Sequence, residues 1–263
     1  MPYAHVNGQK LYFEDTGGDR PAIIFSHGLL MDHEMFAPQV AAFRDDWRCI
    51  TWDERAHGKT AGDTLDPFSY YDSADDLAAL IRHLGLKNAV IAGMSQGGYL
   101  SLRCALTHPD VVRALVLIDT QAQVEDPAKT AGYKPMMEAW AQHGLPEAVA
   151  TTIEHIILGP AWPGAEAWKA KWRGWKGVNL MGAYRTLVTR DDLTDRIANI
   201  RAPTLVIHGD ADMAIELERA EDMARRIPNA SLTVIKGAGH ASNLTHPLPV
   251  NAALMHFLDA LDG

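Results

Sequence analysis

The fold is decided by the stretch Asn88-Ala-Val-Ile-Ala-Gly-Met-Ser-Gln-Gly-Gly-Tyr-Leu100. Its first part, residues 89–92, is a short apolar run that predicts a fully buried strand. The run leads into Gly93-Met-Ser-Gln-Gly97, a G-x-S-x-G pattern, and apolar residues near helical spacing follow it. A strand, a sharp turn and a helix in that order hold a serine in a strained, accessible position, for which the glycines supply the clearance. The sequence therefore indicates Ser95 as a nucleophile at a helix N-terminus, where developing negative charge is favoured.

A purely structural role for Ser95 is the alternative, because serine is a preferred residue at helix N-caps. The G-x-S-x-G pattern is short and arises by chance in turns made of small residues. The choice depends on whether the rest of the chain supplies an acid and a histidine to the same site.

Composition places the chain among ordinary globular proteins, with 47% hydrophobic and 22% charged residues in a total of 263. This length is near the upper end of what one core supports. The net charge of −9 argues against a nucleic-acid partner, which requires a basic face. Cys49 and Cys104 fit no metal or redox spacing, and neither a signal peptide nor an apolar run of roughly 20 residues is visible. We therefore expect a cytoplasmic protein with no membrane partner, and the oligomeric state, a homo-oligomer included, stays open.

Short apolar strands alternate with amphipathic helices along most of the chain. Alternating residues around Asn7-Gly8 predict a hairpin over residues 3–14. Asp72 or Ser73 is the expected N-cap of a helix that runs through Leu84. The other predicted strands span 21–26, 47–52, 112–118, 204–208 and 232–235, and the other predicted helices span 216–227 and 247–261. This alternation predicts an α/β fold with a mostly parallel central sheet and helices on both faces.

Residues 120–199 interrupt the alternation, because they show only helical patterns. These patterns cover 136–143, 147–158 and 165–175. No flexible linker, repeat or low-complexity run borders the block. We therefore expect one core domain, formed by residues 1–119 and 200–263, into which 120–199 is inserted as a helical cap.

Tryptophan is concentrated in the expected cap. Five of the seven tryptophans lie there, namely Trp140, Trp162, Trp168, Trp172 and Trp175. Large side chains of this kind can build the core of a small helical subdomain or line an apolar substrate pocket, and we expect them to do both.

The partners of Ser95 should lie just after strands, because functional groups of parallel α/β sheets gather at the carboxyl ends of the strands. Gly209-Asp-Ala-Asp212 follows one predicted strand, and Gly237-Ala-Gly-His240 follows the last one. His240 is one of twelve histidines, and its place in this glycine-rich loop distinguishes it. Asp210 and Asp212 are both candidate acids at this point. No pairing of histidines or acidic residues suggests a metal site.

The serine, acid and histidine follow one another in the order of the α/β-hydrolase fold, and the chain resembles that family over nearly its whole length. His27-Gly28, the turn at Ser95, Gly209-x-x-Asp212 and Gly239-His240 all stand in the family's order. The resemblance implies the α/β-hydrolase fold, in which a cap covers the carboxyl ends of the strands.

The resemblance also implies roles for single residues. The family's acid typically stands three residues beyond the strand-ending glycine, which is Asp212 in this chain. Asp119 ranks second, because some relatives place the acid there, and Asp210 ranks third as a turn residue. The backbone N–H groups of Leu29 and Gln96 are the implied oxyanion donors.

Within the family, the sequence Gly-Met-Ser-Gln-Gly-Gly at 93–98 is typical of carboxylesterases and of the related 3-oxoadipate enol-lactonases and non-haem haloperoxidases (perhydrolases), which use no cofactor. A serine nucleophile argues against epoxide hydrolases and haloalkane dehalogenases. Carbon–carbon bond hydrolases often carry Asn where this chain has Met94. In residues 53–60, Ala56 and Thr60 replace a glycine and a serine of the family's D-x-R-G-x-G-x-S pattern, so the shape of that turn is open.

We expect an apolar pocket beside the nucleophile, lined by Leu30, Met94, Trp140 and Trp162. An enol-lactonase with a carboxylated substrate should also place a cation there. Arg55, Arg173 and Arg185 are candidates for that cation, although no pattern places them in the pocket. We therefore expect a serine carboxylesterase for small, largely apolar esters. Lactonase, carbon–carbon bond hydrolase or perhydrolase activity, and a non-catalytic ligand-binding protein on the same fold, are the alternatives.

Overall fold

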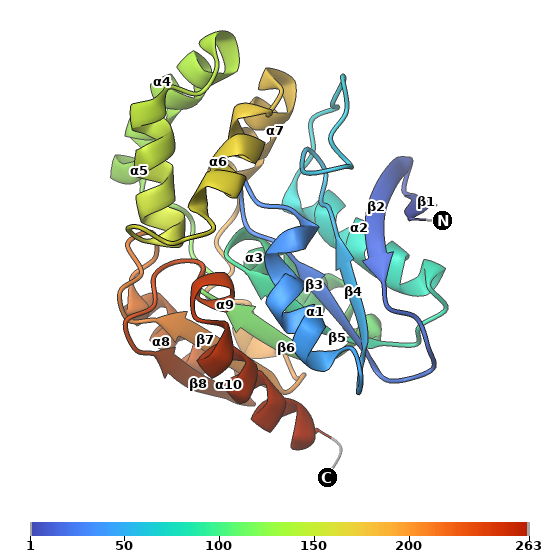
Figure 1. Cartoon of the computed structure of the whole chain (residues 1–263). Coiled ribbons are helices and arrows are strands. Elements are labelled where there is room, and N and C mark those ends of the chain that lie inside the picture. Colours follow the sequence, from blue (N-terminus) through green and yellow to red (C-terminus); the bar gives the residue numbers. More distant parts are fainter. Residues whose placement is uncertain (1, 262–263) are drawn as a thin grey trace.

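An eight-stranded sheet forms the centre of the computed structural model, which describes residues 2–261 (Figure 1). The strand order is β1-β2-β4-β3-β5-β6-β7-β8. The strands are β1 (Tyr3–Val6), β2 (Gln9–Asp15), β3 (Ala22–Ser26), β4 (Arg48–Trp52), β5 (Ala89–Met94), β6 (Val112–Ile118), β7 (Thr204–Gly209) and β8 (Ala230–Ile235). Strands β3 to β8 are parallel, and β2 pairs antiparallel with both β1 and β4. The carboxyl ends of six strands therefore meet at one edge of the sheet.

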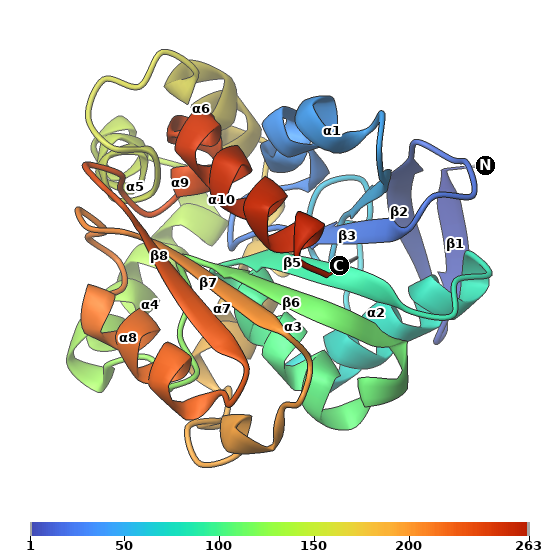
Figure 2. The same ribbon diagram turned by 90° about the horizontal axis from the view of Figure 1, so that it is seen from below.

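Helices cover both faces of the sheet (Figure 2). One face carries α1 (Ala37–Phe43), α9 (Ser242–Thr245) and α10 (Pro247–Asp259), and the other carries α2 (Tyr70–His83), α3 (Gln96–Thr107) and α8 (Leu217–Arg226). Along β5, Val90 and Ala92 enter one hydrophobic cluster, whereas Ala89 and Ile91 enter the other. This alternation follows from the two-residue period of a strand, so that a continuous apolar run fills two layers of core.

Four helices lie between β6 and β7 and gather beyond one end of the sheet (Figure 1). They are α4 (Pro127–His143), α5 (Glu147–Leu158), α6 (Ala165–Arg173) and α7 (Gly177–Val188). Many of their buried side chains, among them Trp140, Trp168 and Trp172, belong to the same hydrophobic cluster as Phe25 of β3. These four helices, called the cap below, thus share one core layer with the sheet, whereas Ala122, Leu193 and Ile197 at the ends of segment 120–199 enter the other layer.

Several elements differ from the predicted ones. Helix α2 begins at Tyr70 with Ser69 as its N-cap, so the prediction of Asp72 or Ser73 as the N-cap was wrong. The carboxylate of Asp72 accepts hydrogen bonds from the backbone N–H and the hydroxyl of Ser69, at 2.8 and 2.7 Å, which is the role of the third helical residue in a capping box. Helix α7 was not marked by any pattern, because Gly177, Asn179 and Gly182 lower its helix propensity.

Helix α4 begins at Pro127 and not at 136 as predicted, and α1 was not predicted. The other expected elements are present within a few residues of their predicted ends, including the hairpin at Asn7-Gly8, where both residues have positive φ. Within residues 2–261, no helix has both the length and the apolar character that crossing a bilayer requires.

Candidate active site

Ser95 occupies the turn between β5 and α3 in a conformation that few non-glycine residues adopt, with φ of 51° and ψ of −115°. Its hydroxyl makes no capping hydrogen bond to α3, which removes the structural alternative. Both flanking glycines are required by close backbone contacts. A Cβ atom on Gly97 would lie 2.0 Å from the carbonyl oxygen of Ser26, and one on Gly93 would lie 2.1 Å from the carbonyl oxygen of Gly97. The strained serine is therefore held by the surrounding backbone.

The structure brings Ser95, His240 and Asp212 together, although they are far apart in the sequence. The hydroxyl Oγ of Ser95 is 3.0 Å from Nε2 of His240, and Nδ1 of His240 is 2.8 Å from Oδ2 of Asp212. The other oxygen of Asp212, Oδ1, accepts hydrogen bonds from the backbone N–H groups of Ala214 and Ile215 at 2.8 and 3.1 Å. This is the geometry of a relay in which a base takes the serine proton and a carboxylate orients the base.

Asp212 and His240 shift each other's pKa toward the charged form. Burial opposes the charged imidazolium, but the adjacent Asp212 carboxylate outweighs it and raises the pKa of His240 above its ordinary value. Burial would raise the pKa of Asp212 in turn, but His240 and the backbone amides hold it below its usual range. Asp212 is therefore ionised and His240 is a stronger base than a free imidazole.

The two other candidate acids have different partners. The oxygens of Asp119 accept hydrogen bonds from the backbone N–H groups of Gly209 and Ser242, each at 2.9 Å. Asp210 accepts from the backbone N–H of Gly237 at 2.6 Å. Burial and, to a smaller extent, the negative charge of Asp212 raise the pKa of Asp119 to about 6. Asp119 thus ties the loops after β7 and β8 together and makes no hydrogen bond to His240.

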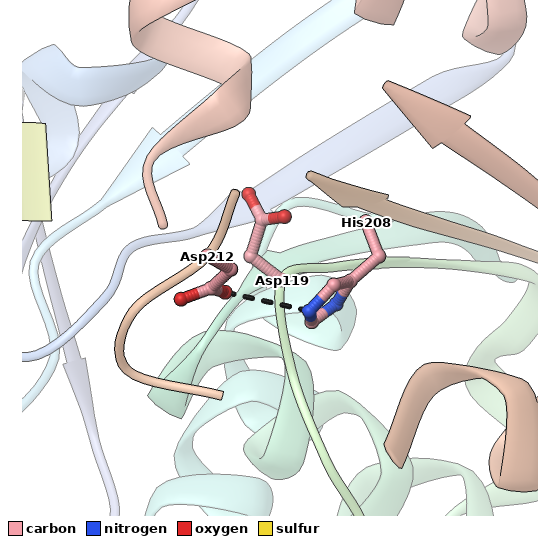
Figure 3. A group of neighbouring side chains, drawn as sticks. All are labelled: Asp119, His208 and Asp212. Atoms are coloured by element: carbon pink, nitrogen blue, oxygen red, sulfur yellow. Dashed lines mark ion pairs between the residues drawn. The ribbon is translucent and has the colours of Figure 1, made fainter. Parts of the chain in front are cut away.

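His208 lies beside Asp212 and Asp119, and the side chains of all three are buried (Figure 3). Its Nε2 is 3.0 Å from the carbonyl oxygen of Ile215 and 3.5 Å from Oδ2 of Asp212. Ligand atoms of the three side chains lie within 4.8 Å of one another, close enough to hold a metal ion. However, all four carboxylate oxygens of the group already accept hydrogen bonds from backbone amides or His240, and these bonds account for the arrangement without a metal. We assign no metal to this group.

The backbone N–H groups of Leu29 and Gln96 donate no hydrogen bond to any other described residue. The Gln96 amide is the first of α3, where the helix offers it no carbonyl partner. Both groups are available to bind an oxyanion, which is the role that we propose for them.

A buried polar network behind Gln96 was missed by the sequence reasoning. The Gln96 side-chain amide donates a hydrogen bond to Glu54, and its oxygen accepts one from Tyr70 at 3.2 Å. The other oxygen of Glu54 accepts a hydrogen bond from Ser73 at 2.5 Å. Burial raises the pKa of the Glu54 carboxyl to about 7. The available signal was the position of Glu54, two residues after the strand that ends at Trp52, since the carboxyl ends of the strands form the site edge of the sheet.

A cavity of about 130 Å³ opens beside Ser95 and His240, between the strand ends and the cap. Leu29, Leu30 and Met94 line it, and apolar side chains of the cap cover it. The cap contributes Tyr133, Met136, Met137, Ile153, Ile156, Ile157, Tyr184 and Leu187, and the remaining lining residues are Met31, Glu125, Ala214 and Ile215. The apolar character that we expected is therefore present.

The expectation that Trp140 and Trp162 line this cavity was wrong. Trp140 is buried inside the cap, and Trp162 lies at a separate hollow beside Gly239. Methionine, isoleucine and leucine take the lining positions, because the tryptophans are used to pack the cap helices.

None of the three arginine candidates lines the cavity either. Arg55 is paired with Asp76 at 2.6 Å, and Arg173 with Glu147 at 2.6 Å.

The alpha/beta hydrolase family model matches residues 23–253 of the chain, which include the nucleophile turn and the loops of Asp212 and His240. The chain belongs to this family. The carbamate hydrolase RutD of Caulobacter sp. strain K31 is 29% identical to it over 258 residues, covering 94% of this chain and 95% of that protein. A non-heme chloroperoxidase of Synechocystis is 29% identical, covering 98% and 100% of the two chains. A solved esterase of Thermogutta terrifontis superimposes with a TM-score of 0.88 at 28% identity, covering 99% of this chain and 97% of the esterase. The names of the carbamate hydrolase and of the esterase support a hydrolase.

Proposed function

We propose that this hydrolase is a serine carboxylesterase for small, largely apolar esters. The observation that carries the proposal is the relay from Asp212 through His240 to Ser95, which ends at a small and mostly apolar cavity. The likeness to an esterase of known structure agrees with it.

The first half of the reaction forms an acyl-enzyme. His240 accepts the proton of the Ser95 hydroxyl as Oγ bonds to the ester carbonyl carbon. The negative charge that develops on the carbonyl oxygen is stabilised by the N–H groups of Leu29 and Gln96, each worth roughly 3 kcal/mol in such sites. His240 then gives its proton to the departing alkoxide, and the alcohol leaves.

The second half releases the acid. A water molecule loses a proton to His240 and attacks the acyl carbon, and Ser95 leaves with that proton. Asp212 keeps Nδ1 of His240 protonated throughout and stabilises the imidazolium that forms twice in each cycle.

Hydrolysis of p-nitrophenyl acetate and p-nitrophenyl butyrate tests the proposal. We expect turnover by the wild type and background rates for Ser95→Ala, while Ser231→Ala, an exposed serine on β8, keeps the wild-type rate. Equal rates for the wild type and Ser95→Ala would show that Ser95 is not the nucleophile, and a ligand-binding protein on this fold would then be the better interpretation.

Carbamate hydrolysis is a second candidate, favoured by the similarity to RutD. The same relay would attack a carbamate carbonyl, and Ser95 would carry a carbamoyl group in place of an acyl group after the alcohol has left. Methyl carbamate and methyl acetate assayed at equal concentration separate the two: a higher kcat/KM for the carbamate would replace the esterase proposal.

A further inference from the structure

One acidic side chain lies among the apolar residues of the cavity. Glu125 lines it together with Tyr133 and Tyr184, and among the described residues that line the cavity no other is acidic. Glu125 follows β6 and precedes α4, so it stands at the junction of the sheet and the cap. A carboxylate at an apolar surface is costly unless it is paired, and its partner therefore decides what the cavity presents to a substrate.

The partner of Glu125 is Arg190, which lies behind it. Arg190 Nη2 is 2.8 Å from Oε1 of Glu125 and also donates to the carbonyl oxygen of Gln123 at 2.9 Å. The guanidinium carbon lies 4.5 Å from the centre of the Tyr99 ring. The Arg190 side chain is only 3% exposed and does not line the cavity. The ion pair is therefore oriented with its negative end toward the cavity and its positive end in the protein.

The second carboxylate oxygen of Glu125 is free for a ligand. Oε1 forms the ion pair with Arg190 and accepts a hydrogen bond from the side-chain amide of Gln121 at 3.4 Å. Oε2 accepts no hydrogen bond from any residue in the described range 2–261. The Glu125 side chain is 18% exposed, in contrast to its buried partner. Its charge is felt inside the cavity, since burial raises the pKa of Tyr133 and Glu125 raises it further.

We propose that Glu125 selects the substrate by charge, favouring esters that carry an ammonium group beside an otherwise short aliphatic chain and disfavouring those that carry a carboxylate. The inference rests on the esterase proposal for the same cavity and names its substrate class. An ammonium group can take the free oxygen of Glu125 as a charge-assisted hydrogen bond, whereas a carboxylate would be brought next to a like charge in a place with little water.

Three methyl esters that share the segment CH2–CH2–CO–OCH3 test the charge preference at pH 7. Methyl 3-aminopropanoate carries an ammonium group at its end, methyl butanoate a methyl group, and monomethyl succinate a carboxylate. For the wild type we expect kcat/KM to fall in the order cation, neutral, anion, with each step about tenfold. In Glu125→Gln the ratios of cation to neutral and of neutral to anion should both shrink by about tenfold. Glu138→Gln, on the same cap and outside the cavity, should leave both ratios at the wild-type values.

Unchanged ratios in Glu125→Gln would overturn the inference while leaving the esterase proposal in place. Calorimetric binding of the three esters to Ser95→Ala, with and without Glu125→Gln, measures the same preference without turnover. A protein that binds the cationic ester best but hydrolyses none of the three would refute the esterase proposal alone, and equal binding of all three would refute the charge selection. If Glu125→Gln does not fold because Arg190 is left without its counter-ion, the double variant with Arg190→Met removes both charges. The same kcat/KM ratios of the three esters are then measured on the double variant, with the same expected decrease.

Discussion

Exchanging each of two buried aspartates for asparagine distinguishes the carboxylate that orients His240 from the one that supports the loops. In Asp212→Asn, the amide oxygen should take the place of Oδ1, because two backbone N–H groups point at that position. The amide NH2 then faces Nδ1 of His240. Since a donor now meets Nδ1, the imidazole must carry its proton on Nε2, the nitrogen that has to accept the proton of Ser95.

The loss of the correct tautomer should lower kcat on p-nitrophenyl butyrate by about 10⁴, which corresponds to roughly 5 kcal/mol of transition-state stabilisation. The melting temperature should change little, because both backbone hydrogen bonds to residue 212 are kept.

Asp119→Asn should show the opposite pattern. Each oxygen of Asp119 accepts one backbone N–H, and an asparagine can satisfy only one of these donors. Leaving the other unpaired should cost about 1–3 kcal/mol of unfolding free energy and lower the melting temperature, with less than a tenfold change in kcat. Activity and thermal unfolding are measured on both variants side by side. A 10⁴-fold loss of kcat in Asp119→Asn, with near wild-type activity in Asp212→Asn, would refute the assignment and make Asp119 the acid.

Three further outcomes follow from individual groups. The raised pKa of His240 means that the base is lost by protonation at a higher pH than for a free imidazole, so kcat/KM should fall as the pH drops through a midpoint above 6.5; a profile that is flat from pH 5 to 9 would argue against a histidine base. Gly97→Ala places a Cβ 2.0 Å from the Ser26 carbonyl oxygen, with backbone on both sides of the contact, and should cost at least about 3 kcal/mol of unfolding free energy. Gly132→Ala in α4 is its control, because it meets nothing within 4 Å and should stabilise the helix by up to about 1 kcal/mol; equal denaturation midpoints for the two variants would contradict the clearance argument. The pKa of Glu54 is raised to about 7, so the folded protein binds more protons than the unfolded chain between pH 4.5 and 7, and stability should decline across that window by on the order of 3 kcal/mol. Glu54→Gln should flatten that part of the pH profile of unfolding, and a profile as steep as the wild type's would show that another group causes it.

The sequence predicts the parts of the site that depend on local geometry. The turn at Ser95 can be read from two glycines, because only glycine fits the backbone contacts on either side. The arrangement of the cap depends on contacts between helices and not on local geometry. A helical pattern shows that residues 147–158 form a helix, but which of its side chains meet the cavity depends on how four helices pack against one another. Trp140 and Trp162 were for this reason assigned to the cavity wrongly, and Glu125 was not marked at all, since a single glutamate between a strand and a helix carries no local signal.

The choice between Asp119 and Asp212 cannot be made from local sequence alone. Both follow parallel strands at the same edge of the sheet, and the side chains of both are buried, so neither position nor burial separates them. The two aspartates differ in the groups that donate hydrogen bonds to their carboxylate oxygens. Asp212 divides its oxygens between two amides of its own loop and His240, which leaves one oxygen pointing at the base. Asp119 uses both oxygens to hold the loops after β7 and β8, the loops that carry the relay. Burial raises the pKa of Asp119, and the nearby negative charge of Asp212 adds to this rise. Asp212 is also buried, but its contact with His240 holds its pKa below the usual range. We therefore propose that Asp212 serves the chemistry and Asp119 the placement of the loops, a division that only their hydrogen-bond partners indicate.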